Sequence, residues 1–306
     1  YAILENDMRR ILAYSIVNQV GFMVTGIGIG TELALNGAAA HAFAHIIYKA
    51  LLLMSAGSVL FMTGKRKCTD LGGLIRTMPV TALCGIIGAL SISSFPLTSG
   101  FVTKSMISAA AGHQHLELVW YLLAAASAGV FLHAGIKFPW FVFFQKDSGL
   151  RPDEPPWNMR AAMVLFAVLC IAIGVAPGPL YALLPFPVDY EPYTAGHVVF
   201  YLQLLLFSGL AFFLMLGWLK RTLTITLDVD WFYRRLGPVA ARRLDAIADA
   251  GWDGLVSGVG RSVRAIATGV HRLHGPGGIL ARPWPTGSMA FWATVMLALY
   301  SILSYL

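Results

Sequence analysis

The chain has 306 residues, of which 22 are lysine or arginine and 15 are aspartate or glutamate. Charged residues make up 12% of it and hydrophobic residues 57%, whereas soluble proteins carry roughly 25% charged residues. A soluble fold of this length cannot hide so much apolar surface, and a disordered chain would be far less hydrophobic. Three scattered cysteines exclude a disulfide scaffold. The composition therefore predicts an all-α, polytopic transmembrane helix bundle embedded in a lipid bilayer.

Long apolar runs place the membrane spans. A span needs about 20 apolar residues, and these runs are too long for the strands of a barrel. We predict helices over 9–30, 33–63, 79–96, 101–144, 160–184, 196–219 and 288–306. The chain then divides into a transmembrane core (1–219), a cytoplasmic amphipathic segment (220–282) and a final transmembrane helix (283–306). Because it begins at Tyr1 without an initiator methionine, we expect an excerpt or the product of a split gene.

The charges of the loops predict the orientation. The loops 65–76 and 220–282 carry net charges of +3 and +5, while the loops on the opposite side are neutral or acidic. Basic loops stay in the cytoplasm, so we place both loops there. Because the basic excess lies beside the membrane, it fits anionic lipid and gives no support to nucleic-acid binding.

One predicted span carries a row of titratable groups. His41, His45 and Lys49 follow one another at intervals of four residues, so they share one helix face. Titratable groups inside a membrane usually line an ion or proton pathway, which makes a proton relay our interpretation. Structural hydrogen bonding is one alternative. Zinc ligation by the two histidines is another, although no third ligand is apparent and we expect no metal.

Lys104 lies about one turn into the segment 101–144, among threonines and serines. A lysine at mid-membrane costs roughly 2.5–3.5 kcal/mol on insertion scales. It can lose its proton, and we therefore interpret it as a proton carrier. The alternative is a lysine whose ammonium reaches a lipid headgroup.

The segment 101–144 is too long for one straight span, since a continuous helix would run for about 66 Å. The sequence GHQH at 112–115 interrupts it, so we predict a discontinuous helix with halves 101–111 and 116–144. Broken helices in membranes line protein-enclosed or watery cavities. Glu117, just after the break, is a candidate counter-charge or cavity-mouth carboxylate.

His133 and Lys137 repeat the spacing of four residues in the long half. They are weaker candidates for the pathway, because Lys137 lies near Pro139 and Trp140 and could extend to an aromatic belt at the membrane surface. We expect no cofactor. The glycines of 26–30 are not a dinucleotide-binding motif, because no strand precedes them. The cysteines lack the spacing of iron–sulfur ligands.

The predicted cytoplasmic segment carries an apolar stripe. After a mixed acidic, aromatic and basic motif at 228–235, apolar residues recur every three or four positions over 244–273. This spacing predicts an amphipathic interfacial helix along the membrane or a neighbouring subunit, broken at its glycines. A soluble helical hairpin is the alternative, because each glycine weakens a long helix.

Several motifs together resemble a known family. The sequences DMRRILAYS at 7–15, NQVGF at 18–22, HAFAHIIYKALL at 41–52, LGGL at 71–74 and FPLTSGFVTK at 95–104 resemble those of antiporter-like membrane subunits, in the same order. This family comprises subunits of respiratory complex I, hydrogenase-associated relatives, and the A and D subunits of Mrp-type cation/proton antiporters. The sequence LHAGIKFP at 132–139 is most similar to the D subunits of Mrp antiporters.

The resemblance implies two inverted repeats, each with a discontinuous helix and a central lysine or glutamate. Lys104 would be the central residue of the second repeat, and Lys49, His41 and His45 the connecting relay. The glutamate and lysine of the first repeat have no counterpart here. The implied function is a proton-translocating subunit of a multisubunit Na⁺/H⁺ antiporter in a prokaryotic plasma (inner) membrane, partnered by other subunits. The alternatives are a proton-pumping subunit of NADH:quinone oxidoreductase or of a membrane hydrogenase, and a non-conducting assembly subunit.

Overall fold

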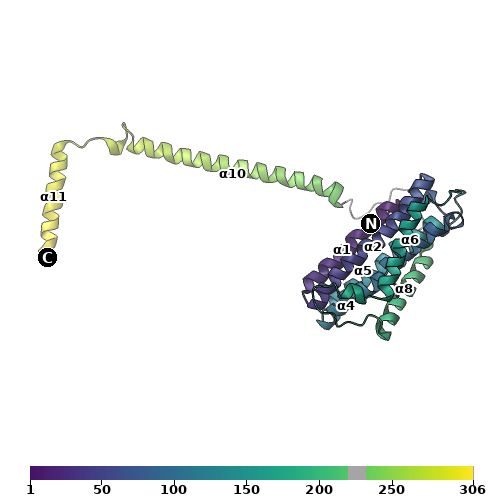
Figure 1. Cartoon of the computed structure of the whole chain (residues 1–306). Helices are drawn as coiled ribbons and strands as arrows, with labels where there is room; N and C mark the ends of the chain where they lie inside the picture. The colour runs from purple at the N-terminus through teal and green to yellow at the C-terminus, as the bar shows by residue number, and fades with distance from the viewer. Residues whose placement is uncertain (220–231, 306) are drawn as a thin grey trace. The chain divides into compact units, whose positions relative to one another are not determined.

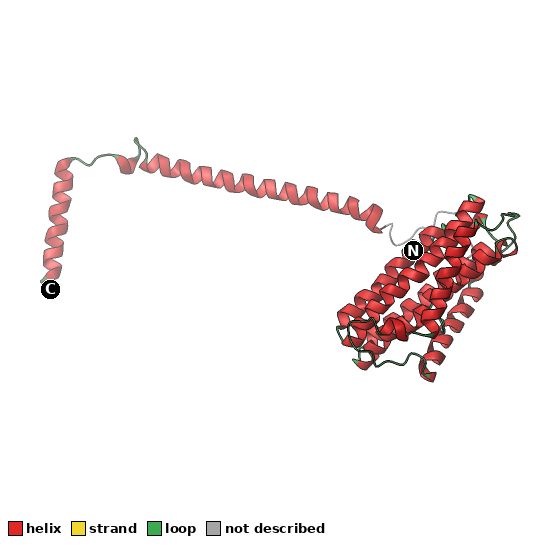
Figure 2. Cartoon of the chain, in the orientation of Figure 1, coloured by secondary structure: helices red, strands yellow, loops and turns green. Residues whose placement is uncertain are grey.

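The computed structural model describes residues 1–219 and 232–305, and Figure 2 shows that these residues form helices joined by loops. No strand occurs in the described ranges, apart from one isolated bridge between Asp7 and Lys67. The chain divides into two units, 1–225 and 226–306. The part of the acidic and aromatic motif at 228–231 lies outside the described residues.

The first two helices begin and end at capping residues. Helix α1 (Met8–Ile29) begins after Asp7, whose side chain accepts hydrogen bonds from two N–H groups of the first turn. It ends at Gly30, and α2 (Glu32–Thr63) ends at Gly64, both in the left-handed conformation that glycine adopts at helix ends. The predicted boundaries of both helices are confirmed to within a residue or so.

Helix α3 (Pro79–Ile92) is shorter than the predicted helix 79–96. Pro96 has no N–H to donate and disfavours helical geometry in the residue before it, so the helix cannot continue through this position. The connection to α4 (Ser99–His113) instead places Ser94 and Leu97 in the left-handed region, with φ of 61° and 68°.

The predicted interruption at 112–115 is confirmed. Helix α4 ends at His113, His115 has a φ of 53°, and α5 (Glu117–Val130) begins two residues later. The long half then continues through two π-helical segments, η3 (Phe131–Lys137) and η4 (Trp140–Phe144). The helix pattern of the sequence does not predict these segments, which lie on either side of Pro139.

The prediction of one helix over 160–184 is wrong at its C-terminal end. Helix α6 (Trp157–Val175) stops before Pro177, and the short α7 (Gly178–Tyr181) follows. The missing N–H of proline and the restricted residue before it explain the stop. Helices α8 (Ala195–Leu214) and α9 (Leu216–Leu219) complete the described part of the first unit.

Helix α2 lies at the centre of this first unit. It packs against α1, α3, α4 and α6, and Figure 1 shows these helices running together in one bundle with α5 and α8. The main hydrophobic core lies between them and includes Leu51, Leu52, Phe138 and Phe141. Because other helices surround α2 on several sides, polar side chains along it, including His41 and Lys49, are buried inside the bundle.

Short 3-10 turns, η1 (Cys68–Asp70) and η2 (Leu74–Arg76), lie in the basic loop 65–76. This loop is joined to the loop after η4, where the Ser148 N–H donates to Gly72 O at 3.1 Å. Asp147 pairs with Arg151 at 2.6 Å and with Arg76 at 3.7 Å. The hydrogen bond from the Arg151 guanidinium holds the pKa of the Asp147 carboxyl well below its usual range.

The second unit contains η5 (Phe232–Leu236), α10 (Gly237–His274), η6 (Ile279–Ala281) and α11 (Thr286–Ser304). Helix α10 is one continuous helix of 38 residues, about 57 Å long. Neither the hairpin nor the break at the glycines occurs. One glycine in a helix costs only about 1 kcal/mol relative to alanine, and the helix continues through each of them.

Six described helices are long and apolar enough to cross a membrane, and α3 is a shorter apolar helix. The six comprise α1, α2, the helix Glu117–Phe144 formed by α5, η3 and η4, and then α6, α8 and α11. The predicted polytopic helical bundle is therefore confirmed, with a discontinuous helix at α4 and α5.

Candidate functional site

Lys104 lies in α4, with its ammonium group inside the bundle and no exposed surface. Its Nζ donates to the carbonyl oxygen of Ile92 at 2.9 Å and lies 3.5 Å from Ser127 Oγ. Ile92 ends α3, and the last carbonyls of a helix have no partner within that helix. The nitrogen also lies 4.8 Å from the centre of the Phe22 ring, within cation–π range. The early end of α3 therefore provides the acceptor for this lysine.

His41 connects α2 to two other helices through both of its ring nitrogens. Its Nδ1 lies 3.0 Å from Thr103 Oγ1 in α4, next to Lys104. Its Nε2 lies 3.1 Å from Gln19 Oε1 in α1 and 3.3 Å from the Tyr48 hydroxyl. Tyr48 also donates to Gln19 Oε1 at 3.0 Å. The imidazole is therefore held between the neighbourhood of Lys104 and a polar pair on α1 and α2.

These neighbours satisfy either neutral form of His41. In the first form, Thr103 donates to Nδ1, and the Nε2 N–H donates to Gln19 Oε1. In the second form, Thr103 donates to Ser99 O, 3.0 Å away, the Nδ1 N–H donates to Thr103, and Tyr48 donates to Nε2. In the second form Tyr48 turns its hydrogen from Gln19 Oε1 to Nε2, so each form gives both ring nitrogens a partner. The surroundings of His41 therefore permit its ring proton to lie on either side.

His45 and Lys49 continue the row along α2. The His45 ring lies 6.4 Å from His41 and 5.4 Å from Tyr48, centre to centre, and the described residues offer its Nε2 no hydrogen-bond partner. Lys49 is buried, and its ammonium donates to Ser15 Oγ in α1. The structure thus places the three residues of the predicted relay on the interior side of α2.

His133 and Lys137 lie on η3, in the same bundle. His133 is buried, and its Nε2 has no hydrogen-bond partner among the residues described. Lys137 is also buried, and its Nζ donates to the carbonyl oxygens of Ala2, Ile3 and Glu5 at 2.7, 2.5 and 2.6 Å. Its ammonium therefore holds the segment before α1 and is enclosed by the protein.

Glu117 is placed apart from the other candidates. It is exposed in the first turn of α5 and forms no hydrogen bond or ion pair within the described ranges. Thr103 belongs to the polar cluster that the sequence places around Lys104. Four other polar side chains that contact the candidate lysines or histidines were not predicted: Ser15, Gln19, Tyr48 and Ser127. The spacing carried a signal for some of them, since Ser15 and Gln19 are four residues apart on one face of α1.

Across the part of the chain that the structure describes, no three histidine, cysteine, aspartate or glutamate side chains gather as metal ligands would. Cys68, Cys84 and Cys170 are buried and form no disulfide.

The fold and this site define a multi-pass membrane protein whose helices enclose a row of lysine and histidine side chains. Residues 1–132 match the family described as NADH:quinone oxidoreductase/Mrp antiporter, transmembrane region. The matched part of the chain contains His41, Lys49 and Lys104.

Two curated relatives match similar shares of the chain. The A/B subunit of a probable K⁺/H⁺ antiporter of Rhizobium meliloti is 31% identical over 58% of this chain and 18% of its own length. The D subunit of a Na⁺/H⁺ antiporter of Alkalihalophilus pseudofirmus is 33% identical over 59% of this chain and 37% of its own. The chain therefore spans well under half the length of either relative.

The fold is similar to that of a chain in the solved structure of the membrane-bound sulfane sulfur reductase, an archaeal respiratory membrane complex. The TM-score is 0.58 at 24% identity, over 98% of this chain and 53% of that one. Since that match covers nearly the whole chain, the likeness in fold is not confined to the segment that matches the family.

Proposed function

We propose that the chain is part of a proton-translocating subunit of a multisubunit Na⁺/H⁺ antiporter. In this proposal, protons pass along a row of buried groups made up of Lys104, His41, His45, Lys49, His133 and Lys137. The observation that carries it is the setting of His41, which bonds to the neighbour of Lys104 through one ring nitrogen and to the Gln19–Tyr48 pair through the other. A side chain that only holds two helices together does not need partners suited to both of its neutral forms.

The row has a direction in the bundle. From His41 to Lys49 it advances about 12 Å along α2, toward the end that leads into the basic loop 65–76. Lys137 bonds the segment before α1, and that segment adjoins the same loop, because the Met8 N–H donates to Arg66 O at 2.9 Å. With the basic loops in the cytoplasm, the row opens to the cytoplasm near Lys137 and has Lys104 as its station deeper in the membrane.

Each member of the row can release and regain a proton. A buried ammonium in the membrane is expensive, so a lysine there exchanges its proton readily, and neutral histidine both accepts and donates. Because neighbouring rings are separated by more than hydrogen-bond distance, water completes the steps between them. The unpartnered Nε2 atoms of His45 and His133 are the positions at which such waters would bind.

We infer sodium exchange and the presence of other subunits from the relatives, one of which is the D subunit of a Na⁺/H⁺ antiporter. The alternative is a proton-pumping subunit of NADH:quinone oxidoreductase or of a membrane hydrogenase. It is favoured by the fold likeness to a chain of a respiratory complex, which extends over α10 and α11. Flavin or iron in the native assembly purified from a prokaryotic inner membrane would favour this alternative, and their absence together with sodium-dependent exchange would favour the antiporter.

For the second unit, we propose that α10 is the cytoplasmic amphipathic segment and lies along the membrane or a neighbouring subunit. Its apolar residues from Leu244 to Leu273 are exposed, and none of its residues is buried within the chain. An apolar stripe of this length must be covered in the assembled protein. Spin labels along 244–273 should therefore alternate between low and high water exposure, whereas uniform exposure would contradict this placement.

The function is tested on Lys104 in the native assembly, using vesicles from cells that carry the variant. Lys104→Ala should abolish or severely reduce proton-coupled transport while the assembly still forms. Lys104→Arg should also impair transport, because a guanidinium keeps its proton. The control is Lys65→Ala, which removes an exposed loop lysine. Wild-type transport by an assembled Lys104→Ala variant would refute the central role and leave a non-conducting role in assembly as the better account.

A further inference from the structure

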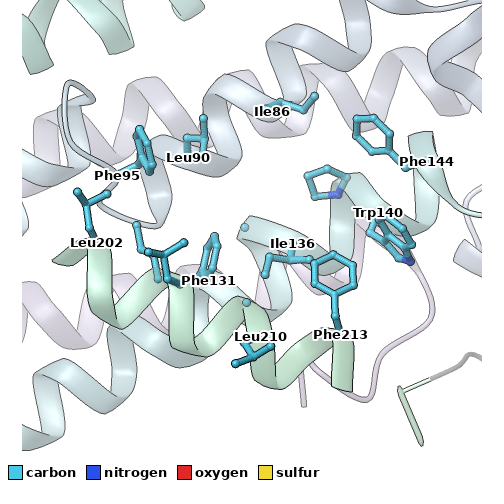
Figure 3. Close-up of a pocket in the computed structure, with 15 residues that line it drawn as sticks. Ile86, Leu90, Phe95, Phe131, Ile136, Trp140, Phe144, Leu202, Leu210 and Phe213 are labelled. Carbon is cyan, nitrogen blue, oxygen red and sulfur yellow. The ribbon is translucent and has the colours of Figure 1, made fainter. Parts of the chain in front are cut away.

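A deep apolar groove runs along one side of the first unit. It lies between α3, the π-helical segments η3 and η4, and α8, and has a volume of about 540 Å³, which is within the usual size of ligand sites. Figure 3 shows Leu90 and Phe95 facing Phe131 and Ile136 across it, with Leu202 and Phe213 of α8 along its edge. The side chains that line it are hydrocarbon or aromatic, so nothing in the groove would hold water.

The groove is open because α8 presents glycine to it. A Cβ atom at Gly209 would meet Phe131 and Ile136 only at 3.5 and 3.6 Å, which is ordinary contact distance. Beside it, Leu206 and Leu210 are exposed, and α8 is one of the helices long enough to span a membrane. The groove therefore opens sideways into the hydrocarbon of the bilayer.

The length of the groove matches one leaflet. Along α8 it extends from Leu202 to Phe213, which is about 16 Å at the rise of a helix. The hydrocarbon core is about 30 Å thick, so this length is about half of it. One acyl chain covers the same depth.

The groove continues toward a positive charge. A second cavity of about 630 Å³ shares Trp140 and Phe144 with it and reaches Gln145 and Lys146 just after η4. Lys146 is exposed and forms no ion pair within the described residues, while its neighbour Asp147 is occupied by two arginines. The apolar part of this slot suits an acyl chain. The tryptophan and the unpaired lysine at its end suit the headgroup of an anionic lipid at the membrane surface.

We propose that this groove binds an anionic phospholipid, with one acyl chain between α3, η3 and α8 and the phosphate at Lys146. A transmembrane helix of a neighbouring subunit could cover the apolar part, but it would leave Lys146 without a partner. The groove is apolar over the depth of one leaflet and then reaches a lysine that forms no ion pair among the described residues. This sequence of an apolar part and a cation matches an acyl chain and its phosphate. The proposal does not depend on proton translocation.

The test measures the lipids that remain on the native assembly after purification in mild detergent, by mass spectrometry. Gly209→Leu should fill the groove and remove about one phospholipid per copy of the chain. The matched control is Gly196→Leu, the same change on the same helix at an exposed position with open space around it. Lys146→Gln should lower the preference for anionic over zwitterionic lipid by about fivefold. Unchanged lipid in Gly209→Leu, or an unchanged headgroup preference in Lys146→Gln, would overturn the proposal.

A second measurement avoids any change to the packing around Gly209. Phe213→p-benzoylphenylalanine places a photoreactive ring at the groove, and the same change at the exposed Phe207, which is outside it, is the control. Adducts at 213 should be enriched in anionic phospholipid, and adducts at 207 should follow the bulk lipid composition. Adducts at 213 to another protein, or to bulk lipid in the same proportions as at 207, would overturn the proposal.

Discussion

Replacing Thr103 by valine removes one hydroxyl from the row of buried groups and keeps the shape of the side chain. That hydroxyl lies 3.0 Å from His41 Nδ1 and 3.0 Å from Ser99 O. It is the only group that the structure shows bonded to Nδ1 in the described part of the bundle. Thr103→Val therefore leaves this nitrogen without a partner in both neutral forms of the imidazole and in its protonated form.

The size of the effect follows from the charge on the ring. A proton that passes through His41 makes it briefly an imidazolium, which donates from both nitrogens. Losing a hydrogen bond to a charged group costs about 1.5–3 kcal/mol, and losing one to a neutral group about 0.5–1.5 kcal/mol. The difference of about 1–1.5 kcal/mol raises the barrier for transfer, so we expect transport to slow by about fivefold to tenfold if this step limits the rate.

The assay is the initial rate of proton movement in vesicles that contain equal amounts of assembled complex. Thr103→Ser keeps the hydroxyl and should transport at close to the wild-type rate. Thr25→Val is the matched control, because Thr25 makes the same bond to a carbonyl four residues earlier, on an exposed part of α1. A Thr103→Val variant that transports as fast as Thr25→Val would refute the assignment of His41 to the pathway.

Three further outcomes are expected. Lys49→Ala should weaken transport more than His41→Ala or His45→Ala in the same vesicle assay, because water can replace a lost imidazole, and equal losses in all three would argue against this. A Cβ at Gly100 would overlap Ser91 O, so Gly100→Ala should prevent assembly on native gels. Gly57→Ala, with open space around it, should assemble normally, and an intact Gly100→Ala complex would contradict the close approach. Because the pKa of Asp147 is depressed by Arg151, its contribution to the loop is present at neutral pH and is lost only as the pH falls below the usual aspartate range. Proteolysis of 145–156 should thus stay slow down to about pH 4, whereas Asp147→Asn should be cleaved faster even at pH 7. Equal cleavage of both proteins would show that the ion pair does not hold the loop.

Local signals predicted much of the helical framework. Apolar length placed the spans, and the capping residues at the ends of α1 and α2 explain why those boundaries agree with the structure. The sequence GHQH located the break between α4 and α5. The end of α6 also had a local signal, Pro177, but the prediction of 160–184 followed the apolar run alone.

Other features depend on residues that are distant in the sequence. The ammonium of Lys104 donates to the carbonyl oxygen of Ile92, which is available because α3 ends there. Lys137 donates to carbonyl oxygens of the segment before α1, more than 130 residues earlier in the sequence. Periodicity could place His41 on a helix face, but it could not identify Thr103 and Gln19 as its partners. These partners come from two other helices, whose packing decides which polar groups meet.

The most direct test of the proton row removes its middle while leaving Lys104 in place. His41, His45 and Lys49 are replaced together by alanine in the native assembly, and proton-coupled transport is measured in vesicles after the amount of intact complex has been confirmed. If protons pass along this face of α2, transport should fall to the level of Lys104→Ala. Transport with unchanged coupling in the triple variant would show that protons take another route and that these side chains only hold the helices together.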